Sequence, residues 1–262
     1  MKKYLLMFIS IICIYIMTTD KLHAVDITAG ATTWYAWMKQ YYKTQVLTNS
    51  KYDINNHSTW LYGPALSVKF NDDFNLTFIY LYGKFILSQR LMEGDFDDDS
   101  DCDYNFKRSD LDLAINYRLN DYFKVFSGIK YLSRKIDRIG TPPTINGYVH
   151  DVENKGYGPG LGISATYPIT NNIFLLGTIS GFYLWCKESK RYNPSISDPL
   201  ETIKTDYNDY GINSGLSIAY YIAPVSTTIS LGGRFQYIKA DSDYDTSKFY
   251  GVTLTATYTF NI

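Results

Sequence analysis

Apolar and polar residues alternate over a dozen positions or more along much of this chain. Near the C-terminus, Val252, Leu254, Ala256, Tyr258 and Phe260 occupy every second position, with Thr or Asn at the positions between them. A period of two places successive side chains on opposite faces of a β-strand. Strands of globular proteins are usually about half this length, whereas a strand that crosses a bilayer at a tilt needs ~9–11 residues plus its rims. The pattern therefore predicts long, two-faced β-strands.

Ten such segments are predicted, and no part of the sequence has a convincing helical period. Eight and twelve strands are the alternatives. The predicted strands cover approximately residues 26–38, 59–71, 74–87, 107–119, 122–135, 154–167, 173–186, 208–222, 226–239 and 248–262.

The connections between these strands alternate strictly between short and long. The short ones are turns rich in Asn, Asp or Pro, at residues 71–73, 120–121, 168–172 and 223–225. The long ones are polar, at residues 39–58, 88–106, 136–153, 187–207 and 240–247. A membrane barrel has periplasmic turns at one rim and surface loops at the other, whereas a soluble sandwich has no reason for this alternation. We therefore predict an all-β fold, a single antiparallel up-and-down transmembrane barrel.

The N-terminal segment has the features of an export signal. Lys2 and Lys3 precede an apolar run, and Ala24 supplies a small residue at a cleavage site. We expect residues 1–24 to be removed, leaving residues 25–262 as one barrel domain. This domain contains no apolar run near the ~20 residues of a spanning helix.

Aromatic residues are abundant, with 26 Tyr, 14 Phe and 4 Trp among 262 residues. Amphipathic rings are typical of a boundary between apolar and aqueous surroundings, such as the interfacial girdles of membrane proteins. The formal net charge is only −1. This small overall charge indicates neither a nucleic-acid partner nor an anionic-lipid partner.

In a barrel, the apolar set of alternate residues faces lipid and the polar set faces the interior. This rule predicts a network of charged residues in the lumen, made of Asp110, Asp112, Arg118, Lys124, Lys130 and Arg234. Both signs of charge are present, so the side chains can form ion pairs. An ionic plug and a narrow path for small solutes both stay open as interpretations. Ten strands lie near the number at which side chains fill the interior, which favours the plug.

Sequence evidence for other chemistry is thin. Alternate aspartates at Asp95, Asp97, Asp99 and Asp101 form a weak calcium candidate, because calcium prefers several carboxylate oxygens. The glycine and distal glutamate of an EF-hand loop are missing, which favours a solvated surface loop. The sequence has no phosphate loop, nucleophile elbow or metal-ligand cluster, so no cofactor is expected.

Two cysteines, Cys102 and Cys186, follow the predicted signal. Both lie at loops or loop edges of the predicted map, on hairpins well separated in sequence. An oxidising compartment permits a disulfide between them, and the sequence leaves this pairing open.

The export signal, the alternation of connections and the final Tyr258-x-Phe260-x-Ile262 pattern together resemble a small outer-membrane β-barrel protein of a double-membraned bacterium. The resemblance covers the chain after residue 24, and it is to an architecture. It implies that the last strand is the signal read by the barrel-assembly machinery. In that class the last residue is usually aromatic, whereas here Phe260 lies two residues before the end.

Ten-stranded barrels also include the omptin surface proteases, which place an Asp pair and an Asp–His pair at the rim. The omptin pairs lie two residues apart on one strand face. Here Asp95 and Asp97 have that spacing, but His150 and Asp151 are adjacent and would face opposite ways. This difference disfavours proteolysis.

We therefore expect a non-enzymatic, monomeric outer-membrane protein. Its surface loops would have structural, adhesion or host- and ligand-binding roles, with outer-membrane lipid and an extracellular ligand as partners. A narrow channel is the alternative function, and a rim protease is the second alternative.

Overall fold

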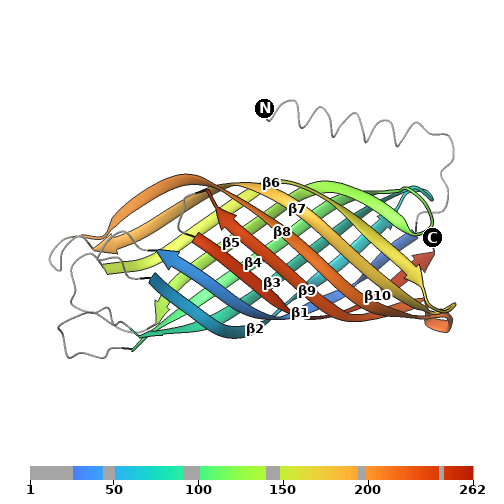
Figure 1. Ribbon diagram of the computed structural model, residues 1–262, viewed down its shortest axis with the longest axis horizontal. Helices are drawn as coiled ribbons and strands as arrows, with labels where there is room; N and C mark the ends of the chain where they lie inside the picture. Colours follow the sequence, from blue (N-terminus) through green and yellow to red (C-terminus); the bar gives the residue numbers. More distant parts are fainter. Residues whose placement is uncertain are drawn as a thin grey trace.

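A computed structural model describes residues 26–43, 51–90, 101–139, 148–193, 199–241 and 245–261. They form ten antiparallel strands closed into a barrel (Figure 1). The strands are β1 (Asp26–Lys43), β2 (Lys51–Lys69), β3 (Phe74–Arg90), β4 (Asp101–Arg118), β5 (Phe123–Ile139), β6 (Tyr148–Pro168), β7 (Ile173–Asn193), β8 (Glu201–Ile222), β9 (Thr227–Ala240) and β10 (Asp245–Asn261). The predicted fold class and strand number are confirmed. No described helix is long and apolar enough to cross a membrane.

The first and last strands close the barrel. Asp26 at the start of β1 pairs with Asn261 at the end of β10 on one side and with Lys69 of β2 on the other. The first residue of β1, the last residue of β10 and the short turns therefore share one rim, here called the turn side. The opposite rim is the loop side.

Side-chain hydrogen bonds shape three of the four turns. The Asn71 side-chain oxygen accepts hydrogen bonds from the backbone N–H groups of Asp73 and Phe74. Asn120 and Thr170 accept equivalent pairs of bonds in the next two turns. This is the local competition for backbone donors that makes Asn and Thr favourable in turns. The fourth turn is a short 3-10 helix, Ala223–Val225.

The strands extend farther toward the loop side than predicted. β2 begins at Lys51, whereas the predicted strand begins at residue 59. β7 continues to Asn193 and β8 begins at Glu201, so both strands extend into the segment 187–207 that was predicted as a loop. In the β7 and β8 extensions, residues 187–191 and 201–206 are mostly polar, so hydrophobic alternation could not reveal these two extensions. Pairing with neighbouring strands satisfies their backbone groups instead.

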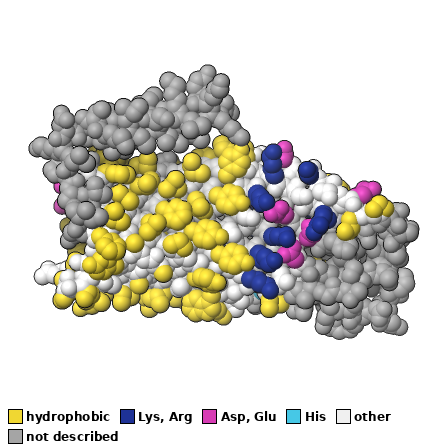
Figure 2. All heavy atoms as spheres, turned by 180° about the vertical axis from the view of Figure 1, so that it is seen from behind, with side chains coloured by type: hydrophobic (Ala, Val, Ile, Leu, Met, Phe, Trp, Pro, Cys, Tyr) yellow, Lys and Arg dark blue, Asp and Glu magenta, His cyan; other side chains and the backbone are white. Residues whose placement is uncertain are grey.

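The two faces follow the predicted parity. On β10, the side chains of Val252, Leu254, Tyr258 and Phe260 are exposed on the outer surface. The intervening threonines face inward, and Thr255 shares a hydrogen bond of 2.8 Å with Thr32 of β1. Figure 2 shows the resulting apolar band over the turn-side part of the barrel. A band of this kind is the surface that a transmembrane barrel presents to lipid.

Candidate functional site

The interior of the barrel is layered along its axis. Toward the turn side lies a cavity of about 400 Å³, lined largely by hydroxyl-bearing and small residues such as Thr32, Thr178, Ser180 and Thr255. Asp112, Lys130 and Arg234 also border this cavity. Toward the loop side the lumen is filled by buried side chains. The charged residues therefore lie where the cavity ends.

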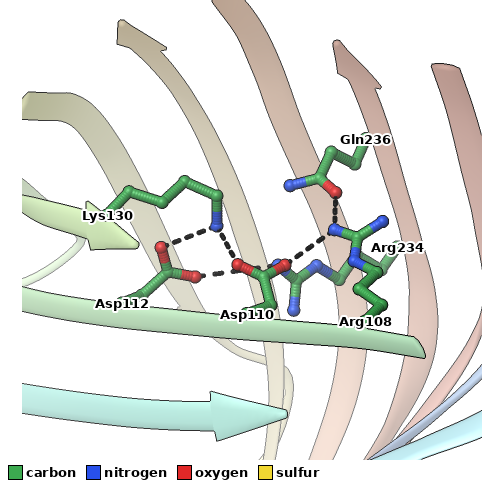
Figure 3. Close-up of polar contacts among 6 residues, drawn as sticks. All are labelled: Arg108, Asp110, Asp112, Lys130, Arg234 and Gln236. Carbon is green, nitrogen blue, oxygen red and sulfur yellow. Dashed lines mark hydrogen bonds and ion pairs between the residues drawn. The ribbon is translucent and has the colours of Figure 1, made fainter. Parts of the chain in front are cut away.

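Asp110 is the centre of the charged layer (Figure 3). Its carboxylate accepts hydrogen bonds from the Lys130 ammonium and from Arg108 Nη2, the latter at 2.8 Å. Arg234 approaches the same carboxylate at 3.6 Å from the opposite side of the barrel. Three cations thus surround one buried anion, and this arrangement offsets part of the cost of burying the charge.

Asp112 completes the layer. It accepts a hydrogen bond of 2.9 Å from Lys130 and lies 3.7 Å from Arg234. Gln236, on the same strand as Arg234, accepts a hydrogen bond from Arg108. These contacts join β4, β5 and β9 across the lumen, so they can hold strands that are not neighbours at a fixed separation.

Arg108 also joins the charged layer to an apolar one. Its guanidinium carbon lies 4.0 Å from the centroid of the Phe249 ring and 5.6 Å from that of Trp34. Arg234 lies 4.7 Å from the Trp34 centroid. Among the described residues, the Nε and Nη1 atoms of Arg108 have no hydrogen-bond partner. The aromatic faces therefore add a favourable interaction for this buried cation, beside its hydrogen bonds to Asp110 and Gln236.

The loop-side half of the lumen is mainly apolar, which corrects the expectation of a polar interior. Its fully buried side chains come from most of the strands and include Trp34, Leu61, Leu81, Phe85, Phe106, Leu132, Leu184, Ile238 and Phe249. A ten-stranded barrel is narrow enough for side chains to meet at its axis, and apolar side chains can fill such a space at high packing density. The sequence contained a signal for this apolar interior. Residues 34–38 and 182–185 are apolar at every position, so apolar side chains point inward as well as outward there.

A second buried ion pair lies at the loop-side edge of this filling. Arg134 Nη2 lies 2.5 Å from Asp209 Oδ2 and donates a hydrogen bond of 3.2 Å to the Tyr207 hydroxyl. Cys186 is a free, buried thiol that donates to the same carboxylate at 3.4 Å. The Cys102 side chain lies outside the described residues. Sequence reasoning missed Arg134 and Asp209 because only the closed barrel brings β5 and β8 together across the lumen.

The structure brings Asp110, Asp112, Lys130 and Arg234 together, but it separates the other two residues of the predicted network. Arg118 lies at the turn-side rim, where it pairs with Asp121 of the adjoining turn. Lys124 lies opposite Arg118 in the β4–β5 register. Both residues have the inward parity, yet their strands end at that rim, far from the charged layer.

Several other predicted residues lie at the margins of the described chain. Tyr258 and Phe260 of the predicted assembly signal face outward on β10, whereas Ile262 lies outside the described residues. Asp95, Asp97 and Asp99 also lie outside them, as does the side chain of Asp101. Within the described ranges, no three His, Cys, Asp or Glu residues are grouped to hold a metal ion.

The rim residues considered for proteolysis do not form a catalytic pair in the described part of the chain. Asp151 accepts a hydrogen bond of 2.7 Å from Arg191 Nε, so this carboxylate is held by a guanidinium. The side chain of His150 lies outside the described residues. The described histidine, His57, has no acidic group in contact with it among the residues the structure covers.

The chain matches no protein-family model and no curated protein sequence. Among solved structures, it is similar to the outer membrane protease OmpT from Escherichia coli, with a TM-score of 0.57, 12% identity, and coverage of 93% of this chain and 100% of that one.

A major outer membrane protein from Thermus thermophilus has a TM-score of 0.44 and 12% identity, with coverage of 91% and 100%. The attachment invasion locus protein Ail of Yersinia pestis has a TM-score of 0.35 and 12% identity, with coverage of 89% and 99%.

At these identities the likeness extends to the fold alone. The outward apolar band, the short turns at one rim and the closed ten-stranded sheet agree with it. The chain has the fold of a small bacterial outer-membrane β-barrel protein.

Proposed function

We propose that this protein is a non-enzymatic outer-membrane barrel with a closed lumen, which acts through its loop-side surface. The observation that carries the proposal is the filled loop-side half of the interior. Phe85, Phe106 and Phe249 are completely buried there, directly beyond the charged layer, and Arg108, which contacts both layers, is completely buried as well.

A solute that crossed this region would have to displace buried ion pairs and aromatic side chains together. Breaking a buried pair by removing one partner typically costs ~3–5 kcal/mol, because a buried charge is left unpaired. The turn-side cavity therefore ends at Asp112, Lys130 and Arg234, and the barrel does not conduct in this conformation.

The loop side offers a surface for binding. β7 and β8 are 21 and 22 residues long, against 14 for β9, and they reach past the ends of β1 and β2 (Figure 1). Residues 201–206 of β8 are exposed on both faces, so this part of the sheet stands clear of the filled lumen. Leu200 and Ile203 are exposed there, and a paired ribbon with apolar side chains is suited to an extracellular ligand or host factor.

The protein would reach this location by export, with residues 1–24 removed, and by recognition of the final strand by the barrel-assembly machinery. We further propose that it is monomeric, since the outer surface between the rims is occupied by lipid.

Planar-bilayer recordings of the refolded residues 25–262 test the closed lumen. We expect no discrete conductance steps, together with no cleavage of a panel of unstructured peptides. Steps that occur in the unmodified protein would instead establish the channel alternative. Peptide cleavage lost in His150→Ala would establish the protease alternative.

For the surface role, beads that display the protein should adhere to an immobilised matrix-protein panel, and Ile203→Asn should weaken that adhesion.

A further inference from the structure

Six strands carry the same short sequence pattern on their outward face. Each contains an aromatic residue and a lysine two positions apart, and the lysine always lies on the loop side. On β1, β3, β7 and β9 the order is aromatic then lysine, as in Trp37-x-Lys39 and Tyr82-x-Lys84. On β6 and β10, which run the opposite way, the order is reversed, as in Lys155-x-Tyr157. The remaining lysines of this set are Lys187, Lys239 and Lys248.

These lysines face outward because their neighbours in sequence face inward. Gly83 and Phe85 flank Lys84 and are buried, and the same holds for the residues beside Lys239 and Lys248. Two further outward lysines, Lys107 and Lys135, lie at the same level on β4 and β5.

The eight lysines surround the barrel at a similar height, on every strand except β2 and β8. Lys84 lies 10 residues beyond Phe74, where β3 leaves its turn, and Lys187 lies 14 residues beyond Ile173 of β7. The other six fall between these limits on their own strands. Figure 2 shows the basic side chains gathered beside the apolar band. This set is called the lysine ring.

The lysine ring lies at the boundary of the apolar band. Between the ring and the short turns, the outward positions of the described strands carry no Asp, Glu, Lys or Arg. The nearest acidic residues lie on the loop side of the ring. Asp137 and Glu153, for example, are each two positions beyond the lysine on their strand. On β6, moving away from the band, the order is therefore aromatic, basic and then acidic, with Tyr157, Lys155 and Glu153.

The ring places like charges beside one another. The sheet register puts Lys39 directly opposite Lys248, Lys84 opposite Lys107, and Lys155 opposite Lys187. Like charges in this relation destabilise a sheet unless a counter-charge is present. Asp137 forms ion pairs with Lys107 and Lys135, each at 2.9 Å, and Glu153 forms an ion pair with Lys155 at 2.7 Å. Among the described residues, no carboxylate pairs with Lys39, Lys84 or Lys248.

We propose that the lysine ring binds the phosphate groups of anionic lipid headgroups in the outer leaflet. Aromatic side chains lie at headgroup level in membrane proteins, and the lysine stems reach from that level toward the aqueous side. A phosphate between Lys39 and Lys248, or beside Lys84, supplies the counter-charge that the protein omits. This inference goes beyond the proposed function, since it concerns the lipid surface of the barrel and needs neither a closed lumen nor a loop ligand.

The formal net charge of −1 conceals this feature because acidic residues are spread over the rest of the chain. Basic residues close to an anionic surface contribute individually, and the interaction decays within a Debye length of that surface. The position of the lysines therefore matters more than the total charge.

The test uses residues 25–262 refolded in nonionic maltoside micelles, with native mass spectrometry to count bound lipid. Dioleoylphosphatidylglycerol is the anionic probe and dioleoylphosphatidylcholine is the zwitterionic one. We expect at least about tenfold tighter binding of the anionic lipid, with the preference weakened by salt. The ring variant Lys39→Gln/Lys84→Gln/Lys248→Gln should lose most of that preference.

A control variant, Lys69→Gln/Lys190→Gln/Lys204→Gln, removes the same charge outside the ring and should retain the preference. Equal retention of the two lipids by the unmodified protein would overturn the proposal, as would equal losses in the two variants. Inorganic phosphate should not raise the melting temperature as phosphatidylglycerol does, and an equal rise would assign the site to free anions instead. If the ring variant fails to fold, the lipid comparison and its salt dependence in the unmodified protein still decide the question.

Discussion

The guanidinium carbon of Arg108 lies 4.0 Å from the centroid of the Phe249 ring, across the lumen between β4 and β10. The same guanidinium donates to Asp110 at 2.8 Å. One side chain therefore belongs to both the charged layer and the apolar filling. This double contact explains how a narrow barrel accommodates a fully buried cation without a second carboxylate of its own.

Replacing Arg108 with Ala should destabilise the barrel by about 3–5 kcal/mol, because it removes one cation beside the buried Asp110 carboxylate and leaves a cavity. Urea unfolding in lipid vesicles, followed by tryptophan fluorescence, measures the change. Arg118→Ala is the matched control, since that side chain is 39% exposed and its pair is worth at most ~1 kcal/mol. Equal losses in the two variants would contradict the role assigned to Arg108.

Opening the interior requires removal of the apolar filling together with Arg108, which links that filling to the charged layer. We expect Asp110→Ala alone to leave the protein without conductance, because Phe85, Phe106 and Phe249 still fill the lumen. The combination Arg108→Ala/Phe106→Ala/Phe249→Ala should produce discrete steps in a planar bilayer. If the single Asp110 variant conducts as well as the triple variant, the apolar layer is not the barrier.

The outward position of Leu216 predicts that the cost in stability of an outward-facing arginine depends strongly on its depth in the membrane. Its side chain is 60% exposed on β8 within the apolar band. Leu216→Arg should cost about 2–4 kcal/mol of unfolding free energy, as for a cation near the bilayer midplane. Thr202→Arg lies on the same face of the same strand but beyond the band, and it should cost less than ~1 kcal/mol. Similar costs at the two positions would be inconsistent with a lipid-facing band.

The Cys186 thiol should react slowly with maleimide while the barrel is folded. It is buried beside Asp209, and its reaction requires local or global opening. The assay uses a Cys102→Ser background and compares folded protein with protein in urea, where labelling should be complete within the mixing time. Rapid labelling of the folded form would place this thiol at the surface.

The Asn120 turn offers a local test of the turn-side rim. Asn120→Ala removes two hydrogen bonds to backbone N–H groups and should lower stability by about 1 kcal/mol. Asp121→Ala in the same turn removes only an exposed ion pair and should have a smaller effect. Equilibrium unfolding of both variants provides the comparison.

The sequence by itself determined the features that depend on neighbouring residues. The period of two on β10, from Val252 to Phe260, established a long strand with one lipid-facing side. Asn71 and Asn120 marked their turns because their side chains bond to backbone only two or three residues away. The number of strands and their alternating direction followed because these strand and turn patterns recur along the chain. The loop-side strand extensions were missed, because only pairing between strands makes them regular.

Tertiary structure alone decided what meets inside and around the barrel. Arg108 and Gln236 are 128 residues apart, and their contact depends on the register of every strand between them. Tyr82-x-Lys84 and Lys155-x-Tyr157 are readable in the sequence, yet only closure of the sheet places their lysines at one height. The stagger of a barrel is a property of all its strands together, so the level of each side chain is set globally. For that reason parity was predictable from single strands, whereas partners across the lumen were not.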